Sequence, residues 1–178
     1  MNIVVDGITY FLGHMDTETH AKVPMMDERG VTFEKPVMVV YSCHCYSKGE
    51  KAGVPFNPAP GALIWDGSKR REFCPQRYSM SLMLPAIVKR MIYSPLAVVW
   101  DTGYGNRHYH ELIGTPNQHA GHPYYIFMRI SKEKLMDGPR VIKMAVESAY
   151  YILPPDPQPR ATKPMSMREW LAKVWANK

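Results

Sequence analysis

Residues 77–92 read RYSMSLMLPAIVKRMI, and four strand-like runs follow them before residue 154. These runs are LAVVWD (96–101), RHYHELI (107–113), YYIFMRIS (124–131) and VIKMAVESAYYIL (141–153). Between Met80 and Met91 the apolar side chains recur every three or four residues, which is the spacing of one face of an α-helix. The four later runs are rich in β-branched and aromatic residues, which is typical of strands. Residues 77–153 are therefore predicted to form a helix and a four-stranded sheet.

The gaps between the four runs are too short to hold crossover helices, so the strands should be antiparallel neighbours in chain order. Pro85 lies within the helical segment and disfavours the α conformation at the residue before it. We therefore expect the helix to kink or split there and to end near Tyr93. The predicted fold class is α+β, with a mostly antiparallel sheet, one central kinked helix and a short C-terminal helix.

The residues before this core are predicted to add short strands and loops. Residues 3–13 divide around Asp6-Gly7, a dipeptide that favours a tight hairpin turn. Residues 14–36 are polar and turn-rich and are interpreted as a connecting loop with a short strand at VTFE (31–34). A strand should follow through Tyr46, then a long Pro- and Gly-rich loop over 47–61. Another short strand is expected at 62–66.

The C-terminal part has two predicted segments beyond the single α+β domain of residues 1–153. Residues 154–165 form a Pro-rich linker. The helix predicted for 166–178 begins with the capping-box pattern of Ser166 and Glu169, whose side chains satisfy backbone N–H groups of the first turn. One stripe of this helix is apolar and must dock on its own domain or on a partner protein. The residues expected in that contact are Trp170, Leu171, Val174 and Trp175.

Composition limits the possible partners and compartments. The chain has 178 residues, of which 46% are hydrophobic and 21% charged, as in ordinary single globular domains. Its formal net charge of +6 favours RNA or single-stranded DNA as a partner. The odd number of three cysteines argues against a disulfide framework. The N-terminal stretch has no basic n-region and reaches Asp6 too early for a signal peptide, and no apolar run is long enough for a membrane span. We expect a cytoplasmic protein with no membrane partner.

Cationic and aromatic residues are interleaved shortly before and at the start of the central helix. This pattern is suited to phosphate contacts and base stacking, although a loop of such charge is also commonly just solvated. The candidate nucleic-acid-binding residues are Lys69, Arg70, Arg71, Arg77 and Tyr78.

A helix followed by a four-stranded antiparallel meander in a small basic protein resembles the barnase, EndoU, colicin and RelE-like (BECR) ribonuclease fold. The stretches RYSMSLMLPAIV, DTGYGN and ESAYYI also resemble a group of uncharacterised bacterial and phage proteins with R-Y-x-L-S, T-G-x-G-N and Q-S-A-Y patterns. That group implies no activity. Met80 stands where the group has Leu, and Glu147 where it has Gln.

The BECR resemblance implies metal-independent RNA cleavage, which requires an acid, a base and cations for the developing oxyanion. His108 and His110 alternate on one strand and so share a face. They are the acid–base candidates, with Arg129 as phosphate clamp and Ser148 as hydrogen-bond donor, provided that these two face the same side. The alternative is a solvated strand face with two ordinary histidines.

Two further motifs have structural and functional interpretations. The turn 102–106 (TGYGN) is either an anion-binding nest or a plain hairpin turn. Cys43 and Cys45 are expected on one face of a strand, where they could join Cys74 in a zinc site or act as small buried hydrophobes. No metal or cofactor is predicted.

Three functions follow from these patterns. The first is a nucleic-acid-directed, toxin-like ribonuclease. The second is a non-enzymatic, phage-type anti-defence protein that binds a host complex. The third is a metal-binding accessory protein built on the cysteine cluster.

Overall fold

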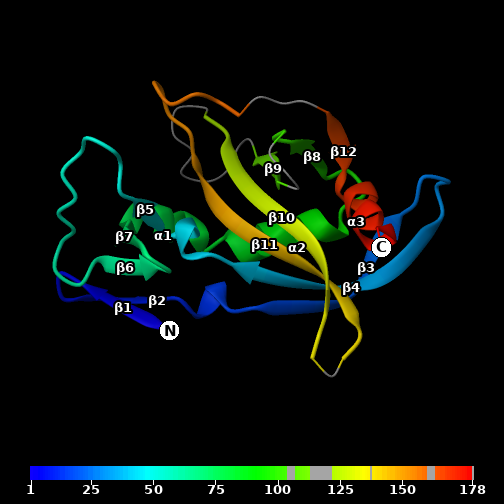
Figure 1. The fold of residues 1–178 in the computed structure, drawn as a ribbon, viewed down its shortest axis with the longest axis horizontal. Helices are drawn as coiled ribbons and strands as arrows, with labels where there is room; N and C mark the ends of the chain where they lie inside the picture. The colour runs from blue at the N-terminus through cyan, green and yellow to red at the C-terminus, as the bar shows by residue number, and fades with distance from the viewer. Residues whose placement is uncertain (104–106, 113–121, 137, 160–162, 178) are drawn as a thin grey trace.

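The computed structural model describes residues 1–103, 107–112, 122–136, 138–159 and 163–177. A seven-stranded sheet runs through the centre of the molecule (Figure 1). Its strands, in spatial order, are β12 (Pro164–Ser166), β8 (Val98–Asp101), β9 (Arg107–Leu112), β10 (Tyr124–Lys134), β11 (Arg140–Tyr151), β4 (Thr32–Tyr41) and β3 (Glu18–Met26). All neighbouring pairs are antiparallel except β11 with β4. The fold is therefore α+β with a mostly antiparallel sheet, and the predicted meander is confirmed as β8 to β11.

The predicted single kinked helix is not confirmed, whereas the alternative of a split helix is, because two helices occupy its place. They are α1 (Pro75–Ser81) and α2 (Leu84–Tyr93), and each has a proline in its first turn. Proline suits that position because its missing N–H would have no intrahelical partner there. The apolar stripe of both helices is buried in one core with the central strands. Its members include Met80, Leu84, Val88 and Met91.

The third helix, α3 (Met167–Ala176), begins with the predicted capping box. Glu169 N donates to Ser166 Oγ at 3.2 Å, and Ser166 N donates to the Glu169 carboxylate at 3.0 Å. Helix α3 packs on β3 and β10, so it covers the same face of the sheet as α1 and α2. We call this the helix face. The last residues of the predicted linker form β12, which pairs with β8.

A smaller unit lies at the end of the molecule away from α3 (Figure 1). Its three-stranded sheet has the order β5 (Ser47–Gly49), β7 (Lys69–Phe73) and β6 (Leu63–Asp66). The hairpin of β1 (Asn2–Val5) and β2 (Ile8–Phe11) packs beside it and shares a second apolar core. The predicted turn is confirmed, since Asp6 and Gly7 both have positive φ.

Gly61 allows the β1–β2 hairpin to approach this unit closely. Its φ is +78°, and a Cβ there would lie 2.0 Å from the carbonyl oxygen of Val4. Any other residue would therefore push the hairpin away, because real Cβ atoms do not approach backbone oxygens so closely.

Four sequence interpretations before residue 75 need correction, and one of them is the loop predicted for 47–61, because its first residues form β5. The segment 14–36, predicted as a loop, contains most of the 3₁₀ turn η1 (Gly13–Met15), all of β3 and the start of β4, which includes residues 32–34 of the short strand expected at VTFE. Both strands tolerate proline, since β3 is an edge strand and Pro36 lies where the β3–β4 register shifts. The strand predicted through Tyr46 ends at Tyr41, and a second 3₁₀ turn, η2 (Cys43–Cys45), follows it. The segment with Lys69 to Arg71 is a strand, β7.

No helix among the described residues is long and apolar enough to cross a membrane.

Candidate functional site

The four predicted catalytic residues lie on two different faces of the sheet. In the β9–β10 ladder His108 pairs with Met128, whereas Arg129 pairs with Arg107. Paired residues share a face and consecutive residues alternate, so His108 and His110 face the opposite side from Arg129. Ser148 pairs with Phe127 and shares the face of Arg129. The structure therefore does not bring the quartet together.

Both histidines are on the helix face. The His108 side chain is 6% exposed, and its ring stacks on Trp170 of α3 with centroids 4.0 Å apart. His110 Nδ1 lies 2.7 Å from the carbonyl oxygen of Val98. Burial lowers the pKa of His110 from its usual 6.5, opposed by the hydrogen bond to Val98. The packed strand interior thus favours a neutral imidazole at His110.

The opposite face carries a three-membered ion-pair network. The β10–β11 register shifts between Phe127 and Met128, and this bulge places Glu147 opposite no single partner. The Glu147 carboxylate accepts from Arg107 Nε at 2.5 Å and from Arg129 Nη2 at 3.1 Å. The predicted phosphate clamp is thus already paired with a carboxylate of its own chain.

Beside this network lies a group of aromatic rings that sequence patterns did not reveal. We call it the aromatic cluster, and the face that carries it the aromatic face. Its members are Trp100, Tyr109, Tyr125, Phe127 and Tyr150. The Tyr125 hydroxyl donates to Gln158 Oε1 at 2.6 Å, and Gln158 Nε2 donates to the carbonyl of Ile152. The Pro-rich segment is therefore attached to this cluster.

The five predicted nucleic-acid-binding residues do not form one surface. Arg71 is 8% exposed and donates to the hydroxyl and carbonyl of Ser47. The Tyr78 hydroxyl donates to the carbonyl of Phe11, and its ring packs in the second core. Arg71 and Tyr78 therefore make structural contacts, and their assignment as contacts for nucleic acid stays a prediction. Lys69 and Arg70 are exposed on β7, where Arg70 pairs with Glu50 at 2.9 Å.

Arg77 is held rigidly at the start of α1. Its Nη1 donates to the carbonyls of His44 at 3.1 Å and Ser47 at 2.8 Å. Its guanidinium lies over the ring of Tyr150, 4.3 Å from the centroid. Burial lowers the pKa of Arg77, but an arginine stays charged at neutral pH because its ordinary pKa is so high.

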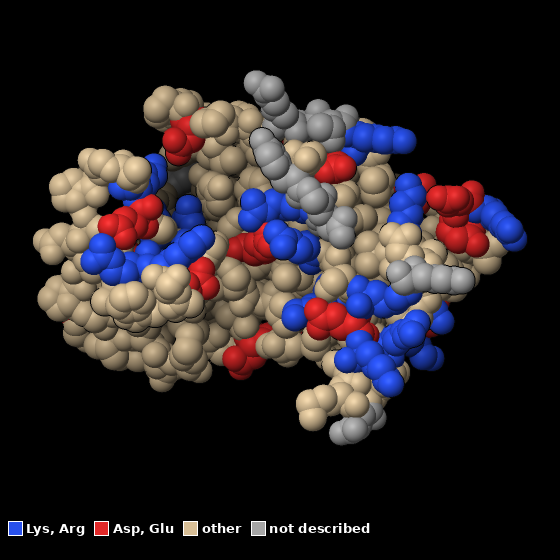
Figure 2. All heavy atoms as spheres, in the orientation of Figure 1, with Lys and Arg blue, Asp and Glu red and all other residues tan. Residues whose placement is uncertain are grey.

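Arg77 borders a cleft of about 550 Å³ between the three-stranded sheet and the end of β11. Figure 2 shows Lys and Arg side chains gathered around a hollow at that end of the molecule. Cations outnumber carboxylates three to two in the lining, and aromatic rings complete it. The cations are Lys48, Lys51 and Arg77, the carboxylates Glu72 and Asp156, and the rings Phe56, Tyr124, Tyr150 and Tyr151. We call this the basic–aromatic cleft. Only Arg77 of this set had been singled out from sequence.

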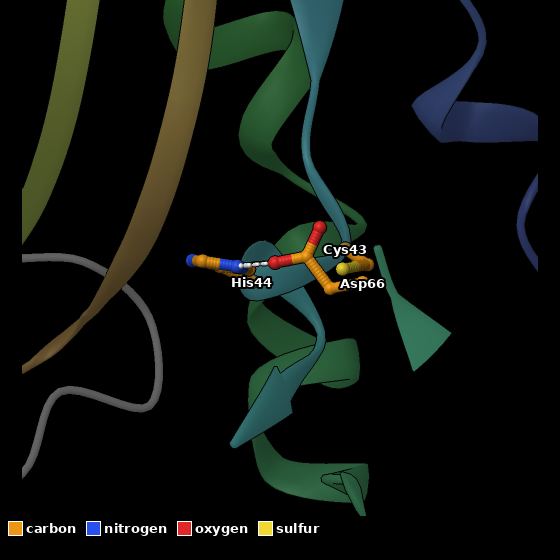
Figure 3. Close-up of side chains that lie close together, drawn as sticks. All are labelled: Cys43, His44 and Asp66. Atoms are coloured by element: carbon orange, nitrogen blue, oxygen red, sulfur yellow. Dashed lines mark hydrogen bonds and ion pairs between the residues drawn. The ribbon is translucent and has the colours of Figure 1, made fainter. Parts of the chain in front are cut away.

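The cysteines are arranged differently from the prediction, because η2 is a 3₁₀ turn and not a strand. Cys45 is fully buried, which raises the pKa of its thiol to about 12, and Cys74 is 5% exposed. The Cys43 thiol instead lies near His44 and Asp66 (Figure 3), with the three possible ligand atoms within 4.8 Å of one another. Sequence analysis missed Asp66, which belongs to β6 and is distant in the chain.

Within this Cys43–His44–Asp66 cluster, the imidazole bonds the carboxylate rather than the thiol. His44 Nε2 lies 2.6 Å from Asp66 Oδ2. That hydrogen bond lowers the pKa of Asp66, and burial, with the nearby Asp66 charge, raises the pKa of the Cys43 thiol. The arrangement is therefore unlike a Cys–His nucleophile pair, in which the imidazole must contact the sulfur and favour the thiolate.

The sequence model of the YjaZ family matches residues 2–175 of this chain. The chain belongs to the YjaZ family. Neither the curated proteins nor the solved structures contain a significant match.

The glycine-rich turn of this YjaZ-family protein lies partly outside the described residues, which exclude 104–106. At its start Gly103 has a φ of +73° and donates its N–H to the Asp101 carboxylate at 2.8 Å. The backbone N–H and hydroxyl of Thr102 both donate to the carbonyl of Arg107. These bonds favour the hairpin-turn interpretation, since the Gly103 N–H binds a carboxylate of its own chain.

The apolar stripe of α3 docks on the YjaZ-family domain itself. Trp170 and Leu171 are buried in the main core, whereas Val174 and Trp175 are partly buried against it. Lys35 and Lys132 extend toward the ring of Trp175, with their Nζ atoms 5.0 and 5.8 Å from its centroid. Trp170 and Leu171 are thus not accessible for the predicted contact with another protein.

Proposed function

We propose that this YjaZ-family protein binds single-stranded nucleic acid, RNA or DNA, in the basic–aromatic cleft. The supporting observation is that Arg77, fixed by two backbone carbonyls and stacked on Tyr150, borders the same cleft as Lys48 and Lys51. Proteins that bind single strands combine cations along the backbone path with rings on which bases stack. The net charge of +6 favours such a partner.

The size of the cleft limits what it holds. A volume of about 550 Å³ lies within the range of small-ligand pockets, so the cleft accommodates a short part of a strand rather than a duplex. Phe56 provides a ring face, and Lys51 and Lys48 are exposed cations positioned to meet phosphates. The ring of Tyr150 already stacks on Phe127 and contacts the Arg77 guanidinium, so it positions Arg77. Glu72 and Asp156 in the lining reduce the positive potential, so we expect moderate and salt-sensitive affinity.

Fluorescence anisotropy with a labelled single-stranded RNA of about 10 nucleotides tests the proposal, a length within the site sizes of such proteins. Affinity should fall as salt rises through counterion release. Lys51→Gln should weaken binding to every sequence and reduce the salt slope by about 0.7, the value for one single-strand contact. Phe56→Ala should cost about 1–3 kcal/mol of binding by loss of stacking.

The matched control is Lys89→Gln, which removes the same charge from an exposed position on α2 outside the cleft lining. It should leave the salt slope unchanged. Absence of binding at low ionic strength, or equal effects of the two lysine variants, would refute a site in this cleft.

Cleavage by the predicted quartet is not part of the proposal, because the histidines and Arg129 occupy opposite faces of the sheet. RNA incubated with the protein in EDTA should therefore remain intact. Metal-independent cleavage that disappears in a His108→Ala, His110→Ala variant of native fold would restore the ribonuclease hypothesis.

A further inference from the structure

The Cys43–His44–Asp66 cluster joins two parts of the fold that are distant in sequence. Cys43 and His44 belong to η2, directly after strand β4 of the main sheet, whereas Asp66 ends β6 in the three-stranded sheet. One thiol, one imidazole and one carboxylate thus meet at the junction of the two sheets (Figure 3).

The turn that carries two of these side chains is held by several hydrogen bonds. Ser42 Oγ accepts from His44 N at 3.0 Å and donates to the carbonyl of Glu147 at 2.6 Å. Ser47 Oγ donates to the carbonyl of Cys43 at 2.6 Å. The backbone of η2 is therefore positioned independently of Asp66, and the cluster does not require rearrangement of the turn to bring its three donors together.

From this geometry we propose that Cys43, His44 and Asp66 bind one Zn²⁺ ion. Sulfur, imidazole nitrogen and carboxylate oxygen are the three donor types that zinc takes in proteins, whereas Mg²⁺ and Ca²⁺ prefer sets of oxygen atoms. Ligand atoms around tetrahedral zinc lie about 3.3–3.6 Å apart, from the usual zinc–ligand bond lengths. The donors here lie within 4.8 Å of one another, so small side-chain rotations suffice.

The cluster is accessible to solvent, because two of its three side chains are only partly buried. The side chains of His44 and Asp66 are 33% and 41% exposed. The hydrogen bond between them, now 2.6 Å, lengthens as both atoms turn to the ion, and the Cys43 thiol releases its proton on binding. Water from the solvent side completes a four-coordinate site. The bound ion links η2 to the β6–β7 hairpin, and this inference is independent of the nucleic-acid proposal.

Titration of the metal-free full-length protein with Co²⁺ tests the site, because a thiolate bound to Co²⁺ gives a charge-transfer absorption in the near ultraviolet. The band should saturate at one equivalent, and Zn²⁺ should abolish it by displacement. Cys43→Ser should eliminate the band. His44→Gln and Asp66→Asn should weaken binding by more than the roughly 10- to 100-fold that loss of an outer partner costs.

Cys74→Ala is the matched control, because it removes a buried thiol that lies outside the cluster. This variant should keep the band. A second measurement is the melting temperature, which Zn²⁺ should raise in wild type and leave unchanged in Asp66→Asn, whose partly exposed position makes misfolding a small concern. Absence of the band in wild type, or its persistence in Cys43→Ser, would overturn the proposal.

Discussion

The helix face and the aromatic face of the seven-stranded sheet hold their polar side chains in different ways. On the helix face, His108 stacks on a tryptophan and His110 contacts a backbone carbonyl, so the imidazoles are accommodated with the apolar core. On the aromatic face, Arg107 and Arg129 bind the Glu147 carboxylate. Strand alternation separates the two kinds of side chain, since neighbouring residues of β9 point to opposite faces. Arg107 and His108 are neighbours in sequence, but their side chains therefore lie on opposite faces of the sheet and in different surroundings.

The difference is tested most strongly at Trp170, which closes the helix face over His108. Trp170→Ala should lower the free energy of unfolding by about 3–5 kcal/mol, because it opens a cavity and removes the ring stacked on His108. Urea denaturation monitored by circular dichroism measures the change. Trp65→Ala, at a tryptophan that is 61% exposed, should stay within about 0.5 kcal/mol. Equal effects of the two variants would mean that α3 contributes little to this core.

The pH dependence of stability is a second test of the helix face. Since burial holds the folded-state pKa of His110 below its unfolded value of 6.5, the unfolded state binds the proton more readily. The contribution of neutral His110 to the free energy of unfolding is therefore fully present above pH 6.5 and decreases as the pH falls below that value. Denaturation midpoints across this range should show a smaller decrease in His110→Gln.

His14 contributes to the same decrease, because burial also lowers its pKa. His14→Gln should remove a separate part of the pH dependence. Wild-type stability that rises on acidification through this range would contradict the neutral packing of His110.

On the aromatic face the largest expected effect comes from the attachment of the Pro-rich segment. Tyr125→Phe removes the hydroxyl that donates to Gln158 and should cost about 1 kcal/mol of unfolding free energy. The control Tyr93→Phe alters a more exposed tyrosine on α2 and should be nearly neutral. Limited proteolysis should also cut the Pro-rich segment faster in Tyr125→Phe, whereas unchanged rates would show that Gln158 does not secure it.

The smallest effect is expected at the ion-pair network. Glu147→Gln should lower stability by at most about 1 kcal/mol, because both arginines are substantially exposed and solvent screens the pairs. The effect should shrink further in high salt. A double-mutant cycle with Arg129→Gln measures the coupling free energy between Glu147 and Arg129. A coupling well above about 1 kcal/mol would show that solvent screens this pair less than its exposure implies.

The amino-acid sequence by itself determined the elements that local periodicity and capping specify. The meander β8 to β11, the Asp6-Gly7 hairpin and the capping box at Ser166 depend on residues a few positions apart, so their patterns are legible in the chain. The interruption of the helix at Pro85 could also be predicted from sequence. The sequence did not show whether Pro85 would kink one helix or separate two helices, because that depends on packing against the sheet.

Tertiary structure alone decided the arrangement of side chains at the candidate sites. Strand alternation predicted that His108 and His110 share a face. Only the pairing of β9 with β10 decided that this is the helix face and that Arg129 lies on the aromatic face. Likewise, β4 pairs with β11 in parallel across about 100 residues of sequence, and no local pattern encodes such a partner. The basic–aromatic cleft and the meeting of Asp66 with Cys43 and His44 arise from these long-range contacts, because side chains from distant segments become neighbours only when the two sheets come together.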